Sequence, residues 1–196
     1  MKIYLIRHMQ TTWNLVGKLQ GSTDIDLSDF GKEQALKLVD VINLDNIGSI
    51  YSSDKLRTKF LAERLAAKYH LDLRIDDELR EVNVGDWAGS TWDEIKVNYA
   101  DFLTEWFKDN ENIPMPGGES YKQLLNRVLT ALNKAVESTD QDIIVVTHGA
   151  VIRALVCHVL GMELKSRSRF DVDNGSITCL EYEGKFTLKY LNNTLV

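Results

Sequence analysis

The sequence predicts an α/β fold, a three-layer α/β/α sandwich around a mostly parallel central sheet. Short apolar runs typical of buried strands alternate along the chain with longer segments whose apolar residues recur at helical spacing. An antiparallel strand is expected near the C-terminus, and an irregular stretch in the middle is expected to form an inserted helical cap. Because the 196 residues contain no internal repeat and no linker, residues 1–196 are expected to form a single domain.

The first part of the chain is expected to contain two strand–helix units. A strand at residues 2–6 is followed by a polar loop and by a helix over residues 28–42, whose first residue is serine, a good N-cap. A second strand is expected at residues 47–51. Ser52-Ser53-Asp54 is then expected to cap a helix that runs to Tyr69.

The middle of the chain is less regular. A short third strand is expected at residues 71–75, and residues 76–118 then contain three of the four tryptophans and both prolines. A long insertion between core elements carries function more often than bulk stability. This segment is therefore expected to form a cap over an active site.

The last part returns to regular elements. An amphipathic helix is expected over residues 120–137, a strand over 143–147 and a helix over 150–160. Two closing strands, 176–182 and 186–190, are joined at a Glu-Gly turn and should form an antiparallel hairpin.

The composition excludes some classes of function. The formal net charge is −6, whereas nucleic-acid-binding surfaces are usually basic, so no nucleic-acid partner is expected. No stretch reaches the length of a membrane span, and the apolar run before Arg7 is too short for the core of a signal peptide. Cys157 and Cys179 match no disulfide or metal-binding pattern. A cytoplasmic protein without membrane contact is expected, and the sequence leaves its oligomeric state open.

Two histidines follow apolar runs where strands should end. Arg7-His8 comes directly after the first strand, and His148-Gly149 comes after the strand at residues 143–147. Ligands bind outside the carboxyl ends of the strands in open α/β sheets. The two histidines and a nearby arginine therefore predict an anion-binding site at this edge.

The residue types suit phosphoryl transfer. A neutral imidazole such as that of His8 is a competent nucleophile toward phosphorus. Arg7 and Arg57 are the candidates for holding phosphoryl oxygens, because guanidinium groups stay charged and bind them bidentately. His148 and the backbone amide of Gly149 are expected to donate hydrogen bonds that stabilise the transition state.

The departing oxygen also needs a proton. Glu81, which follows the third strand, is the preferred candidate for a general acid. Its spacing alone does not exclude Glu78 or Asp86.

Five segments together resemble the motifs of the histidine phosphatase superfamily, also called phosphoglycerate-mutase-like. The resemblance runs nearly the full length of the chain. It is carried by Arg7-His8-Met9-Gln10-Thr11-Thr12-Trp13-Asn14, Ser52-Ser53-Asp54-Lys55-Leu56-Arg57, Leu79-Arg80-Glu81 with Gly85-Asp86-Trp87-Ala88-Gly89, Pro116-Gly117-Gly118-Glu119-Ser120, and Val145-Val146-Thr147-His148-Gly149.

This resemblance implies a phosphatase that works without a metal or other cofactor on a small phosphomonoester. It implies that His8 is phosphorylated during turnover and that Glu81 is the proton donor. It further implies a substrate-contacting role for Gln20 and a phosphate pocket formed by Arg7, Asn14, Arg57 and His148.

Two positions bear on the activity. Met9 replaces the glycine that the family usually has after the nucleophile, so it is expected to narrow the pocket if that glycine provides clearance. Gln10 is common among the phosphatase branches. Arg153, Arg167 and Arg169 are expected to be solvated surface residues, whereas Trp87 and Trp92 fit a pocket lining and a core position equally well.

Two alternatives remain beside the phosphatase. A phosphoglycerate mutase is disfavoured, because residues 81–85 read Glu-Val-Asn-Val-Gly where such mutases carry Glu-Arg-His-Tyr-Gly. A catalytically silent phospho-ligand-binding protein would have little use for the carboxyl group of Glu81. The substrate is open, with α-ribazole phosphate and sugar phosphates as candidates.

Overall fold

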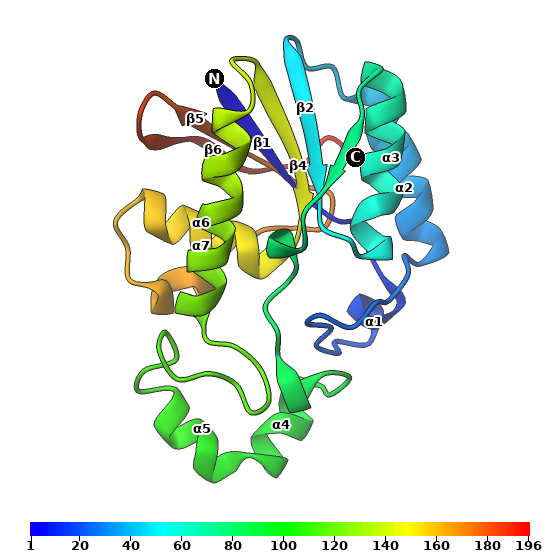
Figure 1. The fold of residues 1–196 in the computed structure, drawn as a ribbon. Coiled ribbons are helices and arrows are strands. Elements are labelled where there is room, and N and C mark those ends of the chain that lie inside the picture. Colours follow the sequence, from blue (N-terminus) through cyan, green and yellow to red (C-terminus); the bar gives the residue numbers. More distant parts are fainter.

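A six-stranded sheet forms the centre of the computed structural model, which describes residues 1–196 (Figure 1). Its strands lie in the order β3-β2-β4-β1-β5-β6. Strands β1 to β4 are parallel, β5 pairs antiparallel with β1, and β6 pairs antiparallel with β5. The strands are β1 (Lys2–Arg7), β2 (Ile47–Ser52), β3 (Leu73–Ile75), β4 (Asp142–Thr147), β5 (Ile177–Tyr182) and β6 (Phe186–Asn193). The predicted α/β class and the C-terminal hairpin are confirmed, and β3 is shorter than predicted.

Helices cover both faces of the sheet. One face carries α2 and α3 and the other carries α6 and α7 (Figure 1). None of the helices combines the length and the apolar character needed to cross a membrane. The helices are α1 (Thr12–Leu15), α2 (Asp29–Val41), α3 (Leu56–Tyr69), α4 (Trp92–Asn98), α5 (Ala100–Trp106), α6 (Tyr121–Glu137) and α7 (Gly149–Val159).

The core lies in two layers because successive side chains of a strand point to opposite faces. In β1, Ile3 and Leu5 pack into the layer beneath α6 and α7. Tyr4 and Ile6 pack into the layer beneath α2 and α3. The apolar run at the N-terminus is therefore a strand buried on both faces, as expected in a parallel sheet.

The helix starts agree with the sequence except at α3. Ser28 caps α2 by accepting a hydrogen bond from the backbone of Gly31. The predicted Ser-Ser-Asp cap of α3 is wrong, because Lys55 is its N-cap and makes no side-chain cap bond. The Leu56 backbone N–H instead donates to Asp24 Oδ1 of the polar loop, at 2.8 Å. Ser53 contacts His148 in the site described below, and Asp54 pairs with Arg80.

Residues 76–118 lie beyond the carboxyl ends of the parallel strands (Figure 1). They contain α4, α5 and two 3₁₀ turns, Asp77–Leu79 and Gly85–Trp87. Trp87 and Trp106 are fully buried and belong to the same apolar cluster as the interior of α6 and α7. The segment is thus fixed on the main core while it faces the edge where the strands end.

Candidate active site

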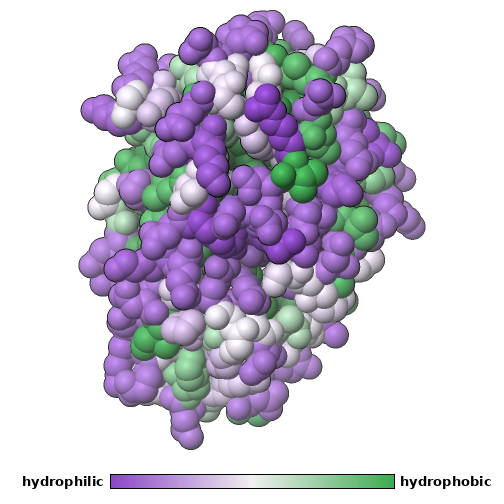
Figure 2. All heavy atoms as spheres, viewed as in Figure 1, coloured by the Kyte–Doolittle hydropathy of each residue, from purple (hydrophilic) through white to green (hydrophobic).

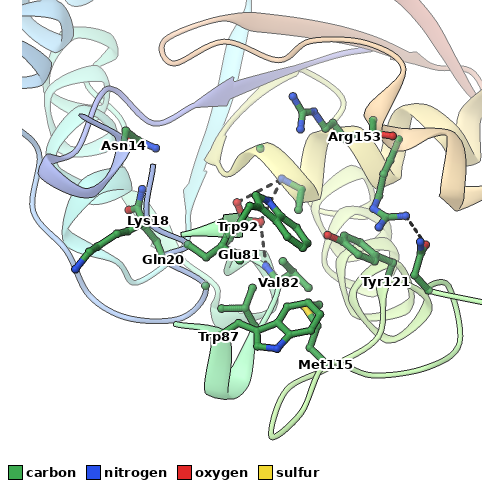
Figure 3. A pocket seen from close by; sticks show the side chains of 18 of the residues that line it. Asn14, Lys18, Gln20, Glu81, Val82, Trp87, Trp92, Met115, Tyr121 and Arg153 are labelled. Atoms are coloured by element: carbon green, nitrogen blue, oxygen red, sulfur yellow. Dashed lines mark hydrogen bonds between the residues drawn. The ribbon is translucent and has the colours of Figure 1, made fainter. Parts of the chain in front are cut away.

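The carboxyl ends of β1 and β4 bring the two histidines together. Arg7 pairs with Thr147 in the sheet, and the backbone N–H of His8 donates to the Thr147 carbonyl at 2.9 Å. The imidazole centroids of His8 and His148 are 5.3 Å apart. This edge opens into a cleft of about 850 Å³, which is shown in Figure 3. His148 is fully buried and is the one predicted site residue that does not line the cleft. The cleft is lined by all the others, which are Arg7, His8, Asn14, Gln20, Arg57, Glu81 and Gly149.

The ring of His8 is held in one tautomer. Its Nδ1 lies 2.7 Å from the carbonyl oxygen of Met9. A carbonyl oxygen only accepts hydrogen bonds, so Nδ1 carries the proton and Nε2 keeps its lone pair. Burial lowers the pKa of His8 well below its usual value, and the charges of Arg57 and Arg7 lower it further. His8 is therefore a neutral imidazole with an unprotonated Nε2.

His148 has the opposite tautomer. The guanidinium Nε of Arg57 donates to His148 Nδ1 at 3.3 Å, so the ring proton lies on Nε2 and is donated to Ser53 Oγ at 2.8 Å. Ser53 Oγ is also 2.8 Å from Thr58 Oγ1. Burial lowers the pKa of His148 well below its usual value, with Arg57 adding to the effect. Sequence reasoning missed Ser53 and Thr58 as the groups that orient His148.

Arg57 is fully buried and has no carboxylate partner. Its Nη1 and Nη2 donate to the carbonyl oxygens of Thr23 and Gly21, at 2.7 and 2.8 Å. A buried cation with only neutral partners is unfavourable unless an anion joins it. The guanidinium has five N–H donors, and the two that remain are available to such an anion. No group of His, Cys, Asp and Glu side chains in the structure is arranged to hold a metal ion.

Arg7 supplies a second guanidinium. Its Nη1 donates to the Val172 carbonyl at 2.6 Å, whereas its Nε is buried and has no acceptor. Gly149, the first residue of α7, lets the guanidinium lie close to the helix, because a Cβ at this position would be 3.3 Å from Arg7 Nε. The start of α7 and the unsatisfied Nε together favour an anion at this place.

Asn14 and Gln20 line the opposite side of the cleft (Figure 3). Asn14 closes the capping box of α1, where its Oδ1 accepts from both the backbone N–H and the hydroxyl of Thr11. Its Nδ2 amide is left as a donor. Gln20 is buried, and its Oε1 has no hydrogen-bond partner. The two amides thus leave two donor groups without a partner, Asn14 Nδ2 and Gln20 Nε2, besides the buried acceptor Gln20 Oε1.

Only one of the three candidate acids lies at the cleft. Glu81 lines the cleft, and neither Glu78 nor Asp86 does. The carboxylate of Glu81 accepts hydrogen bonds from the backbone N–H of Val82, at 2.9 Å, and of Ala150, at 3.2 Å. The second bond ties the carboxylate to the first turn of α7, beside the histidines.

Arg127 fixes the loop that carries Glu81. Its guanidinium donates to the carbonyl oxygens of Glu78, Arg80 and Glu81, at 2.5, 2.9 and 3.0 Å. It also pairs with Glu119, and Glu119 Oε1 accepts from the backbone N–H of Asn83 at 2.7 Å. Residues 116–120 matched the family pattern without an assigned role, and this contact supplies one, because Glu119 and Arg127 clamp the Glu81 loop.

We expect Arg127→Lys to lower kcat/KM for alkyl phosphates by up to about 100-fold, since a displacement of about 1 Å at a reacting group has this effect. Lysine keeps the charge beside Glu119 but cannot reach three carbonyl groups. The value of kcat/KM for p-nitrophenyl phosphate, whose leaving group needs little protonation, should fall much less. Equal losses for both substrates would contradict the positioning role.

Met9 does not narrow the cleft, so that expectation is wrong. Its side chain is fully buried and packs into the apolar layer beneath α2 and α3, away from the cleft lining. Its sulfur would be 2.6 Å from a Cβ at Gly175, where φ is +76°. Met9 thus fills the space that Gly175 leaves open.

We expect Met9→Ala to lower the free energy of unfolding by about 2–5 kcal/mol, which is the usual range for removing a buried methionine side chain. Its effect on KM should be small, because the side chain does not line the cleft. Chemical denaturation and steady-state kinetics measure the two effects. A large change in KM at unchanged stability would contradict this placement.

The outer part of the cleft is basic and aromatic. Arg153, Arg167 and Arg169 all line it. Arg169 is exposed, as expected of a solvated surface residue, whereas Arg153 and Arg167 are only partly exposed. Trp87 is fully buried and Trp92 is partly exposed, and both line the cleft as well. Trp87 is therefore both a core residue and part of the lining, whereas Trp92 belongs to the lining alone.

Fold and site together define an α/β protein with a cleft, lined by arginine and lysine side chains, at the carboxyl edge of its sheet. The model of the histidine phosphatase superfamily (branch 1) matches residues 3–194. The chain belongs to this family.

Relatives within the family differ in their activities. Phosphoserine phosphatase 1 of Hydrogenobacter thermophilus is 32% identical over 184 residues, 93% of this chain and 87% of that protein. Phosphoglycerate mutase-like protein 4 of Arabidopsis thaliana is 34% identical over 158 residues, 79% of this chain and 69% of that protein. The crystal structure of the α-ribazole phosphatase from Shigella flexneri has a TM-score of 0.87 and 26% identity, and covers 100% of this chain and 99% of that one.

Proposed function

We propose that the protein hydrolyses a phosphate monoester through a phosphohistidine intermediate on His8. The observation that carries this proposal is the hydrogen bond from Nδ1 of His8 to the Met9 carbonyl, at 2.7 Å. It leaves the unprotonated Nε2 of a neutral ring in a cleft lined by Arg7 and Arg57. The phosphatases among the relatives agree with this reaction.

In the first step, Nε2 of His8 attacks phosphorus and the bond from phosphorus to the leaving oxygen breaks. Glu81 in its protonated form gives its proton to that oxygen, so the alcohol leaves neutral. Arg7 and Arg57 bind the non-bridging oxygens and offset their charge. Asn14 donates its Nδ2 amide to the same group, and the backbone amide of Gly149 adds a further donor.

In the second step, the ionised Glu81 takes a proton from water while the water oxygen attacks phosphorus. The bond from phosphorus to His8 Nε2 breaks, and inorganic phosphate leaves. His148 stays neutral and orients the Arg57 guanidinium through its Nδ1. Gln20 is proposed to contact the leaving group, and residues 76–118 to act as its cap.

The substrate class is a small phosphorylated metabolite, with α-ribazole phosphate and sugar phosphates as candidates. The residues at 81–85 and the phosphatase relatives disfavour the phosphoglycerate mutase alternative. The carboxylate of Glu81 in the cleft speaks against a silent phospho-ligand-binding protein.

The test is phosphate release from p-nitrophenyl phosphate, 3-phosphoglycerate and fructose 6-phosphate in EDTA and ¹⁸O-labelled water. We expect free phosphate that carries one atom of ¹⁸O. Movement of phosphate between the hydroxyl groups of phosphoglycerate without release would identify a mutase instead. Thermal stabilisation by phosphate without any turnover would identify a silent binder.

A further inference from the structure

The cleft is basic although the chain is acidic overall. The chain has 23 Lys and Arg against 29 Asp and Glu, yet Glu81 is the one carboxylate among the residues that line the cleft. Arg7 and Arg57 lie where the phosphoryl group would bind. Six further cations line the rest of the cleft, at Lys18, Lys96, Arg153, Lys165, Arg167 and Arg169.

Two of the six cations are already neutralised. Lys96 pairs with Asp93 at 2.9 Å, and Lys165 pairs with Glu163 at 2.7 Å. For Arg153 the nearest carboxylate oxygen, on the exposed Asp171, is 3.9 Å from Nη2, and the Arg153 Nε is buried without an acceptor. Arg153 therefore makes only one long ion pair and keeps a buried N–H donor without an acceptor.

Arg153 lies next to the phosphate pocket. It is four residues after Gly149 on α7, so the two positions share one face of the helix. Burial is the main cause that lowers the pKa of Arg7, and the charge of Arg153 lowers it further, which places the two guanidinium groups within electrostatic range. Figure 3 shows Arg153 and Tyr121 on the side of the cleft opposite Asn14 and Lys18.

Arg167 adds a rigid second donor to this wall. Its guanidinium lies 3.4 Å from the centre of the Tyr121 ring, and its Nη1 donates to Asn110 Oδ1 at 2.7 Å. The Arg167 guanidinium makes two hydrogen bonds, and both are donated by Nη1. Its Nε and Nη2 are left without a hydrogen-bond partner. Arg169 follows on the same short segment and has no carboxylate partner. Hydrophilic side chains gather in a band across the middle of the face seen in Figure 2, where the strands end.

We propose that the substrate carries a second anionic group on its leaving group, a carboxylate or a second phosphate, and that Arg153 binds it together with Arg167 and Arg169. This inference rests on the proposed function, because the first anion is the phosphoryl group held by Arg7 and Arg57. The cleft has room for both groups, since pockets of roughly 300–1,000 Å³ hold an entire small-molecule ligand. A substrate without the second anionic group would leave the buried Nε of Arg153 without an acceptor.

The test compares esters that differ in the second anion. One pair is 3-phosphoglycerate and glycerol 3-phosphate, in which a carboxylate replaces a hydroxymethyl group. The other pair is fructose 1,6-bisphosphate and fructose 6-phosphate. We expect kcat/KM to favour the member with the second anionic group in at least one pair by about 10- to 100-fold, as hydrogen bonds to a charged group allow. The pair with the larger ratio shows whether the subsite takes a carboxylate or a phosphate.

The assignment to Arg153 is tested by substitution. Arg153→Gln should bring the ratio in the favoured pair close to one, by lowering kcat/KM for the ester with the second anionic group more than for its partner. Arg64→Gln is the matched control, because Arg64 stacks on Phe60 outside the cleft and should leave the ratio as in the wild type. A wild-type ratio near one in both pairs, or a ratio that survives in Arg153→Gln, would overturn the inference.

Binding separates this inference from the proposed function. Calorimetric titration of the His8→Ala variant with the same four esters measures affinity without turnover. A preference for the esters with a second anionic group, in a protein whose wild type releases no phosphate, would support the subsite and reject the hydrolase. Turnover of all esters without any preference in rate or affinity would support the hydrolase and reject the subsite.

Discussion

Replacing His8 with alanine is expected to lower kcat for phosphate release by at least about 10⁴-fold, as loss of a catalytic nucleophile does in other enzymes. No other imidazole lines the cleft, and both ring nitrogens of the neighbouring His148 are already hydrogen-bonded. Phosphate release is measured in EDTA, with the fold checked by circular dichroism.

The control for this variant is His158→Ala. His158 is an exposed residue in the last turn of α7 and does not line the cleft. Its replacement should leave kcat close to the wild-type value. If His8→Ala retained a tenth of the wild-type activity, the attacking group would have to be a different one.

Glu81→Gln is expected to lower kcat/KM for alkyl phosphates by about 10²- to 10⁴-fold, the usual contribution of a general acid. The glutamine keeps the size of the side chain and can still accept from the Ala150 amide, so the fold should persist. The value of kcat/KM for p-nitrophenyl phosphate should fall much less, because nitrophenolate leaves without a proton. A larger loss of kcat/KM for alkyl phosphates than for p-nitrophenyl phosphate identifies proton donation, because a structural defect would affect both substrates alike.

Glu78→Gln is the matched control for the acid. Glu78 lies three residues earlier in the chain but does not line the cleft. Its replacement should produce no difference between alkyl and aryl substrates. If Glu78→Gln lowered kcat/KM for alkyl phosphates much more than for p-nitrophenyl phosphate, while Glu81→Gln stayed close to wild type, the general acid would be Glu78.

The sequence predicts the parts of the site that depend on strand ends. Apolar runs locate β1 and β4, and in a parallel sheet their carboxyl ends meet, which brings His8 and His148 together. Helix spacing and Ser28 locate α2 equally well. These features are local, because each depends on a few neighbouring residues.

Features that depend on contacts between distant segments were not predictable in the same way. Ser53 could cap α3 or orient His148, and only the position of β4 beside β2 decides for His148. The direction of the Met9 side chain depends on the space over Gly175, more than 160 residues away in the chain. Whether Arg153 is solvated or lines a cleft depends on where residues 76–118 lie relative to α7.

The decisive measurement is to trap the phosphoenzyme in the Glu81→Gln variant. With p-nitrophenyl phosphate the first step needs no acid, whereas the second step loses its base, so the intermediate should accumulate. We expect a burst of one nitrophenolate per active protein, together with a phosphoryl group that is labile in acid, stable in alkali and located on the peptide that contains His8. Turnover with no such label, or a label on another residue, would contradict the phosphohistidine route.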